Sequence, residues 1–469
     1  MKWFFPEQKK VHCIGIGGVG MSALAWYLND LGWKVSGSDI NDFRMRKRLE
    51  KKGIKVYLYH DEKHVRQSSM VIYSSAIPEH HSEIMRARTM KIPVFERMEA
   101  IKDLLESKKL IGVSGSYGKS TTTTFVSSMM RNAGLEPNWL IGADLLEYPP
   151  AFVSKAPWLV LECDESKKHF LALHPFVAII SNVGQDHLQE YHGSMNELAN
   201  TLMEFASRVP KEGLIVLNGD DPLLFKFKDY IKDRNIITCG TTLLSDIRFS
   251  ELQPFWDGSH FSTRFTLIDS TQTPRKVQIP MPGWQNALDA VMAWTATSYL
   301  SPEQSLDVSL FNQLPSLDRR LEHKGSFKKT LLFDDEGDSP EVIRLALQTL
   351  RSYFPERALV PIVQPHRYSR LSFLFEEYAK VLLEESSDII LMPVYSAGEK
   401  SQNELKSEDL AQKILSMGFA GSLYQADDHQ DAIKRASMDM GKEKIFVTLG
   451  PGDVWRVADG LSEIISSLS

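Results

Sequence analysis

The sequence of 469 residues has few cysteines, no long apolar run and no excess of positive charge. Its three cysteines, Cys13, Cys163 and Cys239, lie far apart in apolar surroundings, which excludes a disulfide framework or a zinc motif and indicates buried thiols in a reducing cytosol. No apolar stretch reaches the roughly 18 residues of a membrane-spanning helix, and the residues before Val11 lack the order of a signal peptide. These absences predict a soluble, cytoplasmic protein with no membrane partner.

The balance of charge excludes a further class of partner. The 54 lysines and arginines face 60 aspartates and glutamates, so the net charge is −6 and the pI is near 6.1. A domain that binds nucleic acid is usually basic. We therefore expect no nucleic-acid partner, and the hydrophobic content of 43% is that of a globular protein with a sizeable core.

Strand-like and helix-like segments alternate along nearly the whole chain, which predicts an α/β fold with mostly parallel sheets. Polar stretches near residues 107–109 and 314–318 separate three such blocks. We therefore expect three domains. Within the second block, strict alternation of apolar and polar residues over 246–280 predicts an antiparallel appendage. The domains are placed at residues 1–107, 108–314 and 315–469.

The most informative segment is IGVSGSYGKSTTTT, which begins at residue 111. A buried-strand pattern meets Gly115 and Gly118, and then Lys119, Ser120 and a row of threonines open a helix. This is a phosphate-binding loop with one residue fewer between its glycines than the common pattern. Backbone N–H groups and the helix dipole would hold the phosphates of ATP, Lys119 would neutralise the β- and γ-phosphates, and Ser120 would ligate Mg²⁺. The alternative is a glycine turn with a solvated lysine. The remaining ATP-binding residues of the loop are Ser116, Tyr117 and Thr121.

A second glycine motif, GIGGVG, follows the first strand-like segment and opens a helix. An acidic residue, Asp39, ends the next strand about 20 residues later, as in dinucleotide-binding folds. The backbone geometry requires only a diphosphate at the helix N-terminus, so NAD and a UDP-sugar are equally suitable ligands, and a tight turn without ligand is the alternative. A later loop, Ser75 and Ala76, could close over the ligand. The motif consists of Gly15, Gly17, Gly18, Val19 and Gly20.

Carboxylates follow the strand expected beside the phosphate loop. Glu162 is best placed to hold Mg²⁺ with the loop hydroxyl, although Asp164 and Glu165 remain possible. The next strand ends in NVGQDH, where His187 could ligate a second metal ion. Within the C-terminal third of the chain, the motif QPHRYSR follows an apolar strand. Its arginines lie three residues apart, which suits a bidentate grip on a carboxylate or phosphate, although a solvated basic turn is the alternative.

Together and in this order, these motifs resemble those of the Mur ligases of peptidoglycan synthesis. The resemblance covers essentially the whole chain, and it is closest to the branch that adds L-alanine. The motifs that carry it are HCIGIGGVGMSALA, GSYGKSTTTT, ECDES, NVGQDHLQEYHGS, NGDDP, PGWQN, DRRLE, DDEGDSP, QPHRYSR, VYSAGE and GPGD.

The resemblance implies a Rossmann-like UDP-sugar-binding domain, a central P-loop ATPase domain and a C-terminal Rossmann-like domain that binds the amino acid. It implies that the carboxylate of UDP-N-acetylmuramate attacks the γ-phosphate of ATP and that an amine then displaces phosphate from the acyl phosphate. Positioning and charge neutralisation are what the protein supplies to such a phosphoryl transfer. The substrates would be UDP-N-acetylmuramate, ATP with Mg²⁺ and an amino acid, and the protein would be a monomer or weak homodimer.

The family's functional residues transfer to matching positions of this chain. Lys119, Glu162 and His187 would handle phosphates and metal ions, and Asn286 would contact adenine. Arg320 and Asp335 would meet ATP from the C-terminal domain. The amino acid's carboxylate would bind to His366, Arg367 and Arg370, and its site would include Glu336 and Asp338.

Several residues depart from the family's usual motifs. Ser116, Tyr117 and Ser120 replace Thr, His and Thr in the phosphate loop, and Gln285 and Asp289 replace His and Asn near the adenine position. Glu336 and Asp338 replace a tyrosine and a histidine, and two added carboxylates would favour a cationic group. An amino acid other than L-alanine, or a peptide, is therefore an alternative substrate, and neutral drift is the competing explanation. A dehydrogenase fused to an ATPase and a non-catalytic regulatory paralogue are further alternatives.

Overall fold

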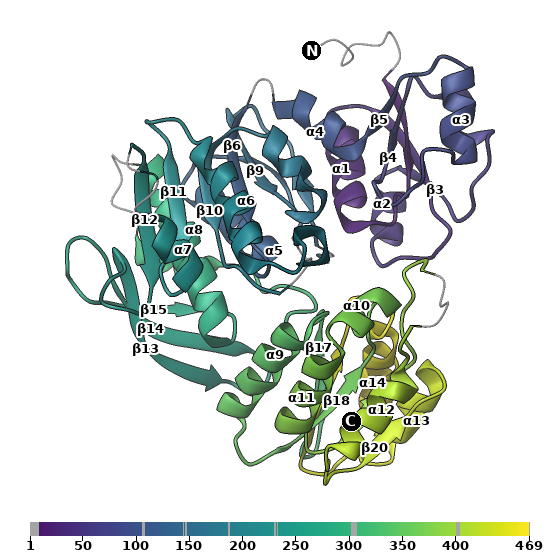
Figure 1. Ribbon diagram of the computed structural model, residues 1–469, viewed down its shortest axis with the longest axis vertical. Coiled ribbons are helices and arrows are strands. Elements are labelled where there is room, and N and C mark those ends of the chain that lie inside the picture. Colours follow the sequence, from purple (N-terminus) through teal and green to yellow (C-terminus); the bar gives the residue numbers. More distant parts are fainter. Residues whose placement is uncertain are drawn as a thin grey trace. The chain divides into compact units, whose positions relative to one another are not determined.

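The computed structural model describes residues 9–105, 108–143, 145, 148–185, 188–228, 231, 233–301, 307–399 and 404–468. Its described residues form three sheets with helices between their strands, so the predicted three-domain α/β class is confirmed (Figure 1). The chain divides into two compact units. The first holds Met1–Leu252, Arg264–Ile279 and Trp284–Pro315, and the second holds Gln253–Thr263, Pro280–Gly283 and Ser316–Ser469.

The first sheet has five parallel strands in the order β3-β2-β1-β4-β5. Its strand order reverses between β1 and β4, and in open α/β sheets ligands bind at such a switch point. The glycine motif lies there, between β1 and α1. Four of the strands, β1 to β4, are strand-like segments in the sequence, whereas β5 is only three half-buried residues. The elements are β1 (Lys10–Ile14), α1 (Val19–Asp30), β2 (Lys34–Ser38), α2 (Arg46–Lys51), β3 (Lys55–Tyr57), η1 (His64–Gln67), β4 (Met70–Tyr73), α3 (Ser82–Thr89), β5 (Val94–Glu96) and α4 (Arg97–Leu105).

The second sheet has ten strands in the order β15-β14-β13-β12-β11-β10-β6-β9-β7-β8. The phosphate-loop strand β6 lies between β9 and β10 and is parallel to both, so the polar residues after these three strands meet at one edge. This confirms the predicted neighbour of β6. The elements up to β12 are β6 (Lys109–Ser114), α5 (Lys119–Asn132), β7 (Asn138–Leu140), β8 (Ala151–Phe152), β9 (Trp158–Glu162), η2 (Ser166–Ala172), β10 (Pro175–Ile180), η3 (Leu188–Tyr191), α6 (Met195–Ser207), β11 (Leu214–Asn218), α7 (Pro222–Phe227) and β12 (Asn235–Gly240).

The alternating segment of the sequence forms three consecutive strands at one end of this sheet, β13 (Ile247–Trp256), β14 (Phe261–Ile268) and β15 (Arg275–Ile279). A four-residue turn joins β13 to β14, a connection that only antiparallel neighbours allow. The division between the two compact units falls within β13 and β14. The chain then continues through α8 (Gly283–Leu300) and η5 (Val308–Gln313).

The third sheet has six strands in the order β16-β17-β21-β18-β19-β20, and all pairs except β16 with β17 are parallel. The four strand-to-loop units predicted from the sequence are β17, β18, β19 and β21. The edge strands β16 and β20 have no apolar run that would predict them. The elements are β16 (Glu322–Phe327), β17 (Thr330–Asp335), α9 (Pro340–Tyr353), β18 (Ala358–Val363), α10 (Tyr368–Phe373), α11 (Phe375–Glu385), β19 (Ile389–Leu391), α12 (Ser407–Ser416), β20 (Leu423–Gln425), α13 (His429–Ser437), β21 (Lys444–Leu449) and α14 (Trp455–Leu468).

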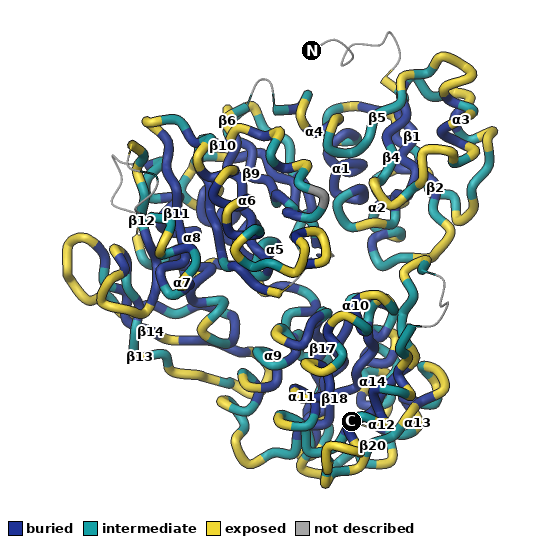
Figure 2. Tube along the Cα trace, in the orientation of Figure 1, coloured by how far each residue is buried: buried dark blue, intermediate teal, exposed yellow. Residues whose placement is uncertain are grey.

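The central strands of the sheets are the most buried parts of the chain (Figure 2). All three cysteines are free and buried, as predicted, and burial raises the pKa of the Cys13 and Cys239 thiols to about 12. Such thiols stay protonated and act as small apolar side chains. Among the helices of the described residues, we find none whose length and apolar character would let it cross a membrane.

Candidate active site

The phosphate loop connects β6 to α5 and depends on glycine at its last turn. Gly118 has φ +80° and precedes the first residue of α5, and a Cβ there would lie 2.9 Å from a carboxylate oxygen of Asp289. At this position the loop has no room for a side chain, and its backbone lies in the left-handed region that favours glycine. Thr123 and Thr124 donate from their hydroxyls to the carbonyls of Lys119 and Ser120, at 2.7 and 2.8 Å, and so brace the first turn of the helix.

Lys119 extends back over the loop. Its Nζ donates to the Gly115 carbonyl at 2.7 Å and to the Ser116 carbonyl at 3.1 Å, and it lies 3.0 Å from a carboxylate oxygen of Glu165. The Glu165 side chain is fully buried, and the Tyr191 hydroxyl donates to the backbone carbonyl of Glu165 at 2.6 Å. The ammonium group is thus held at the mouth of the loop by three oxygen acceptors. From the sequence, Glu165 is a possible metal ligand, whereas in the structure its carboxylate forms an ion pair with Lys119.

Ser120 and Glu162 form the site that suits a cation. The Ser120 hydroxyl donates to Glu162 Oε2 at 2.8 Å, and the Gly142 N–H donates to the same oxygen at 3.1 Å. Burial raises the pKa of Glu162, while the charge of Lys119 and the Ser120 hydrogen bond oppose this rise. A hydroxyl beside a carboxylate is the oxygen donor set that Mg²⁺ prefers. The third carboxylate of the motif, Asp164, accepts from the Ser166 N–H at 2.9 Å.

The loop after β10 holds the phosphate loop from its other side. Asn182 Oδ1 accepts from the Tyr117 N–H and its Nδ2 donates to the Tyr117 carbonyl, both at 2.9 Å. Ser116 Oγ accepts from the Gly184 N–H at 2.8 Å. This loop therefore fixes Ser116 and Tyr117. Asn182 lies in the NVGQDH motif, but the sequence alone predicts no role for it. His187 lies outside the described residues.

The adenine candidate lies on α8. Asn286 and Asp289 are three residues apart and share a helix face, and Asp289 is the residue that approaches Gly118. The Gln285 side chain donates to Asp289 Oδ1 at 3.2 Å. Both substituted positions of this motif therefore lie together, within reach of the phosphate loop. Thr121, the last predicted loop residue, is buried in the first turn of α5.

The first glycine motif is organised by residues at the end of β2. The N–H groups of Gly15 and Ile16 donate to the Ser38 carbonyl at 2.8 and 3.1 Å, and the Gly17 N–H donates to Asp39 Oδ2 at 2.9 Å. A Cβ at Gly17 would lie 2.8 Å from that oxygen. Asp39 therefore lies against the loop, as the fingerprint predicts, and fixes its backbone.

The loop that follows β4 lies beside this motif. A Cβ at Gly15, whose φ is +75°, would lie 3.1 Å from Ser74 Cβ and 3.2 Å from Ile77. Ser75 and Ala76, at the tip, are exposed. Gly18 and Val19 stand at the start of α1, where Gly18 is the N-cap. All the predicted UDP-sugar residues are thus gathered at one end of the first sheet.

A cavity in the first unit extends from the first glycine motif to Glu162, the partner of Ser120. Val19, Gly20 and Arg97 line it from the first sheet's helices, and Gly142, Glu162 and Asp164 line it from the second sheet. A Cβ at Gly20 would lie 2.6 Å from Arg97 Nη1, so the guanidinium lies directly over the glycine loop. Arg97 follows the short strand β5 and belongs to no motif, so the sequence alone does not predict its role.

The second unit brings Arg320, Asp335 and Glu336 together. Arg320 Nη2 lies 3.2 Å from Glu336 Oε2, and Asp335 accepts from the N–H groups of Leu321 and Gly337, both at 2.8 Å. Burial raises the pKa of Asp335 to about 6, against the opposing charge of Arg320. A neighbouring residue that sequence analysis missed, Arg319, is buried and pairs with Asp334 at 2.9 Å.

The QPHRYSR motif lies at the carboxyl end of β18 in the same unit. Arg370 forms an ion pair with Asp338. Burial, with the charge of Arg370, lowers the pKa of His366 to about 4, and its Nδ1 is buried without a hydrogen-bond partner among the described residues. Arg367 has φ +66° and donates its N–H to the Tyr395 carbonyl at 2.8 Å. A non-glycine residue in this conformation is strained by about 1–3 kcal/mol, which is characteristic of functional sites.

Comparison with known proteins matches the chain from near its start to near its end. Family models described as "Mur ligase family, catalytic domain", "Mur ligase middle domain" and "Mur ligase, glutamate ligase domain" match residues 10–109, 113–297 and 319–452. The UDP-N-acetylmuramate–L-alanine ligase of Dictyoglomus turgidum is 33% identical over 457 residues, 97% of each chain. The enzyme of that name from Aquifex aeolicus is 33% identical over 447 residues, 95% of each chain.

A solved structure has the same fold. The crystal structure of UDP-N-acetylmuramate–alanine ligase from Thermotoga maritima superposes with a TM-score of 0.82, at 24% identity, and covers 98% of this chain and 100% of that one.

Proposed function

Because the chain belongs to the Mur ligase family, we propose that it is an ATP-dependent ligase that joins L-alanine to the lactyl carboxylate of UDP-N-acetylmuramate in peptidoglycan precursor synthesis. The domains in this proposal are residues 1–107 for the UDP-sugar, 108–314 for ATP and 315–469 for the amino acid. The reaction takes place in the cytoplasm, where ATP and UDP-sugars are available.

The observation that carries the proposal is the cavity between the first glycine motif and Glu162, which lies beside the phosphate loop. One end is formed by Gly20 at the N-terminus of α1, where a diphosphate is stabilised by the helix dipole. The other end is formed by Glu162, which accepts from Ser120 of the phosphate loop. A UDP-sugar bound at the first motif can therefore direct its carboxylate toward the γ-phosphate of ATP at the second. Neither a dehydrogenase nor an isolated ATPase needs a cavity that connects a diphosphate-binding loop to the cation site of a phosphate loop.

In the proposed reaction, the lactyl carboxylate oxygen bonds to the γ-phosphorus as the bond to the β-phosphate oxygen breaks, which gives an acyl phosphate and ADP. The amine nitrogen of L-alanine then attacks the acyl carbon, loses a proton, and inorganic phosphate leaves. Lys119 neutralises charge on the phosphates once it moves from its carbonyl partners, and loop N–H groups hold the phosphate oxygens. Ser120 and Glu162 would hold Mg²⁺, which when bound neutralises further phosphate charge. His187 is proposed as the ligand of a second metal ion.

The amino acid is proposed to bind at the QPHRYSR motif of the second unit. Arg367 and Arg370 offer guanidinium groups for its carboxylate, and neutral His366 offers a buried ring nitrogen. Arg320 and Asp335 belong to the part of this unit that is proposed to meet ATP, with Asn286 at the adenine ring. Glu336 and Asp338 are each paired with an arginine, so their charge is compensated and does not select a cationic substrate. L-Alanine is therefore favoured over a cationic amino acid.

The test is phosphate release by the full chain with ATP, Mg²⁺ and UDP-N-acetylmuramate against a panel of amino acids and short peptides. We expect release that requires L-alanine, with UDP-N-acetylmuramoyl-L-alanine identified by mass spectrometry. Release with another amino acid but not with L-alanine would overturn the proposed substrate. No release with any of them, from protein that still binds ATP, would support the non-catalytic alternative. Binding of NAD(H) would support the dehydrogenase alternative.

A further inference from the structure

A cluster of four histidines surrounds one buried carboxylate in the first domain, on residues that the proposed ligase reaction does not use. Glu83 lies in the first turn of α3 and is fully buried. Among the described residues, two groups could hold a metal ion, with ligand atoms within 4.8 Å of one another, and Glu83 belongs to both. One group is completed by His12 and His64, and the other by His60 and His81.

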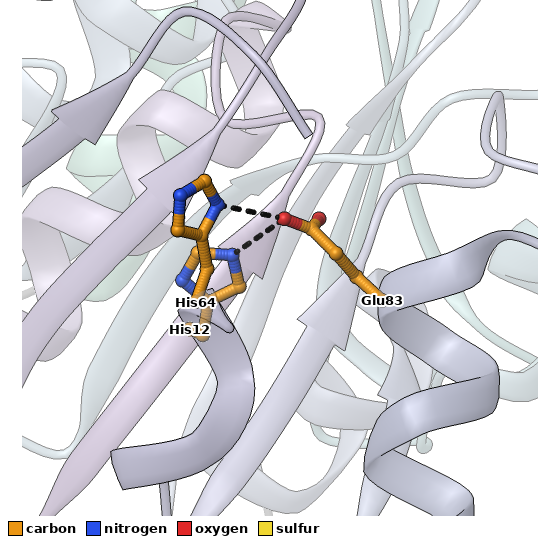
Figure 3. A group of neighbouring side chains, drawn as sticks. All are labelled: His12, His64 and Glu83. Atoms are coloured by element: carbon orange, nitrogen blue, oxygen red, sulfur yellow. Dashed lines mark hydrogen bonds and ion pairs between the residues drawn. The ribbon is translucent and has the colours of Figure 1, made fainter. Parts of the chain in front are cut away.

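The group of His12, His64 and Glu83 has the spacing of a metal site (Figure 3). Nδ1 of His64 lies 2.9 Å, and Nε2 of His12 3.7 Å, from the same oxygen, Glu83 Oε1. Tetrahedral zinc, with bonds of about 2.0–2.2 Å, separates its ligand atoms by roughly 3.3–3.5 Å, which lies between these two values. The side chains are 0%, 5% and 0% exposed for His12, His64 and Glu83.

The two histidines of this group are held in orientation by neighbouring side chains. His12 Nδ1 lies 2.9 Å from the Ser36 hydroxyl, and the ring of His64 stacks on Tyr57 with centroids 3.7 Å apart and planes at 13°. Metal-binding histidines characteristically use their second nitrogen in a hydrogen bond such as that of His12, which fixes the ring and leaves the first nitrogen for the metal.

The Nε2 atom of His12 faces the oxygen atoms of this group. It lies 3.7 Å from Glu83 Oε1 and 3.3 Å from the Ser38 hydroxyl, which donates to Glu83 Oε2 at 2.6 Å. A cation bound to Nε2 and Glu83 would therefore lie among several buried donor atoms.

We propose that His12, His64 and Glu83 bind one divalent transition-metal ion of the zinc class, with a water molecule as fourth ligand. Imidazole nitrogens select such an ion over Mg²⁺, so this site is distinct from the one at Ser120. Its role is structural, because the Ser38 hydroxyl bonds to Glu83 while the Ser38 carbonyl accepts from Gly15 and Ile16. An ion at Glu83 thereby fixes the end of β2 on which the first glycine loop rests.

The test uses the chelator-treated full chain with excess Mg²⁺, titrated with Co²⁺ and then with Zn²⁺. We expect one equivalent of Co²⁺ to produce the visible absorption of a tetrahedral site, Zn²⁺ to displace it, and Zn²⁺ to raise the thermal midpoint by mass action. His64→Asn and Glu83→Gln are expected to abolish the spectrum. Ser36→Ala keeps every ligand and is expected to weaken Co²⁺ binding about tenfold or more, since it removes an outer contact.

Two histidine variants provide matched controls. His80→Asn changes an exposed histidine next to the cluster and is expected to bind Co²⁺ like the unmodified protein. His81→Asn removes the other group, including a ring nitrogen that is buried without a hydrogen-bond partner among the described residues, and is expected to keep the spectrum. Loss of the spectrum in His81→Asn but not in His64→Asn would overturn the ligand set. No Co²⁺ uptake by the unmodified, folded protein would overturn the site, and neither result depends on ligase activity.

Discussion

Asp338 forms an ion pair with Arg370 at the carboxyl end of β18. Arg370 is buried, and its partner comes from the loop after β17, so one carboxylate of the chain lies where the proposed amino-acid substrate would place its own. A bidentate guanidinium does not distinguish the two carboxylates by chemistry. In the proposed site, Asp338 would therefore compete with the substrate for Arg370, which is a different effect from attracting an ammonium group.

Removing the charge of Asp338 is expected to strengthen substrate binding. In Asp338→Asn, Arg370 loses its competing carboxylate, and we expect the KM for L-alanine to fall roughly tenfold, the size of a hydrogen bond to a charged group. The measurement is phosphate release against L-alanine concentration at saturating ATP. Asp427→Asn, an exposed carboxylate elsewhere in the same unit, is the control and should leave KM unchanged. A higher KM in Asp338→Asn would instead mean that Asp338 binds the substrate amine.

The Ser120 hydroxyl is expected to matter through the metal ion. Ser120→Ala removes the group that donates to Glu162, and we expect the Mg²⁺ concentration for half-maximal phosphate release to rise at least about tenfold. Ser120→Thr keeps a hydroxyl and should restore most of the lost activity. Ser127→Ala is the matched control, because this buried hydroxyl of α5 donates to the Thr123 carbonyl one turn earlier, within its own helix. Equal Mg²⁺ dependence in Ser120→Ala and Ser127→Ala would remove Ser120 from the metal site.

The strands that the sequence predicts are those with continuous apolar runs, such as β6 and β21, which are buried on both faces. The edge strands β5 and β16 escape prediction because they are short or polar: β5 has three half-buried residues, and β16 reads EHKGSF. Their place in a sheet is decided by their neighbours and not by their own composition.

The candidate site likewise contains residues that the sequence predicts and residues that it does not. Gly118, Lys119 and Ser120 are predictable because one short loop must satisfy a phosphate group with fixed residue types. Arg97 and Glu165 are not, since each reaches its partner only after the chain has folded: Arg97 lies over Gly20, and Glu165 pairs with Lys119. The sequence also shows the charges of Glu336 and Asp338 but not the arginines that compensate them.

Asp335 is expected to make the stability of the chain depend on pH. Its pKa in the folded protein is about 6, above the ordinary 3.8, so between about pH 4 and pH 6 the folded chain keeps a proton that the unfolded chain has released. Stability therefore falls as pH rises through this window. At about 1.4 kcal/mol per unit of pKa, the loss approaches roughly 3 kcal/mol at pH 7.

The variant Asp335→Asn cannot titrate and should lack this loss. The measurement is the free energy of unfolding in denaturant at several pH values from 4 to 7.5, compared between the unmodified chain and the variant. The amide also loses one acceptor for the Leu321 or Gly337 N–H, which lowers stability at every pH, so the comparison rests on the slope with pH. Asp427→Asn should keep the slope of the unmodified chain, and an unchanged slope in Asp335→Asn would contradict the raised pKa.

Arg97 is expected to act on the UDP-sugar and not on ATP. Its guanidinium lies over Gly20 at the first glycine motif, in the cavity that Glu162 closes on the opposite side. A cation at this position attracts both the diphosphate at the helix N-terminus and the lactyl carboxylate on its way to the γ-phosphate. Arg97→Gln should therefore raise the KM for UDP-N-acetylmuramate about tenfold or more, with the KM for ATP little changed.

The contrast between the two KM values separates binding from general damage to the fold. Lys119 bonds to carbonyls of the phosphate loop and to Glu165 and so belongs to the proposed ATP site, and a variant that merely loosens the first unit would raise both constants. Arg88→Gln, which breaks an exposed ion pair with Glu79 in the same domain as Arg97, is the control and should change neither. If Arg97→Gln raises the KM for ATP as much as that for the UDP-sugar, Arg97 supports the structure of the cavity and does not bind the sugar nucleotide. A selective effect would place the UDP-sugar at Gly20 and so fix the direction in which the substrate carboxylate approaches Ser120 and Glu162.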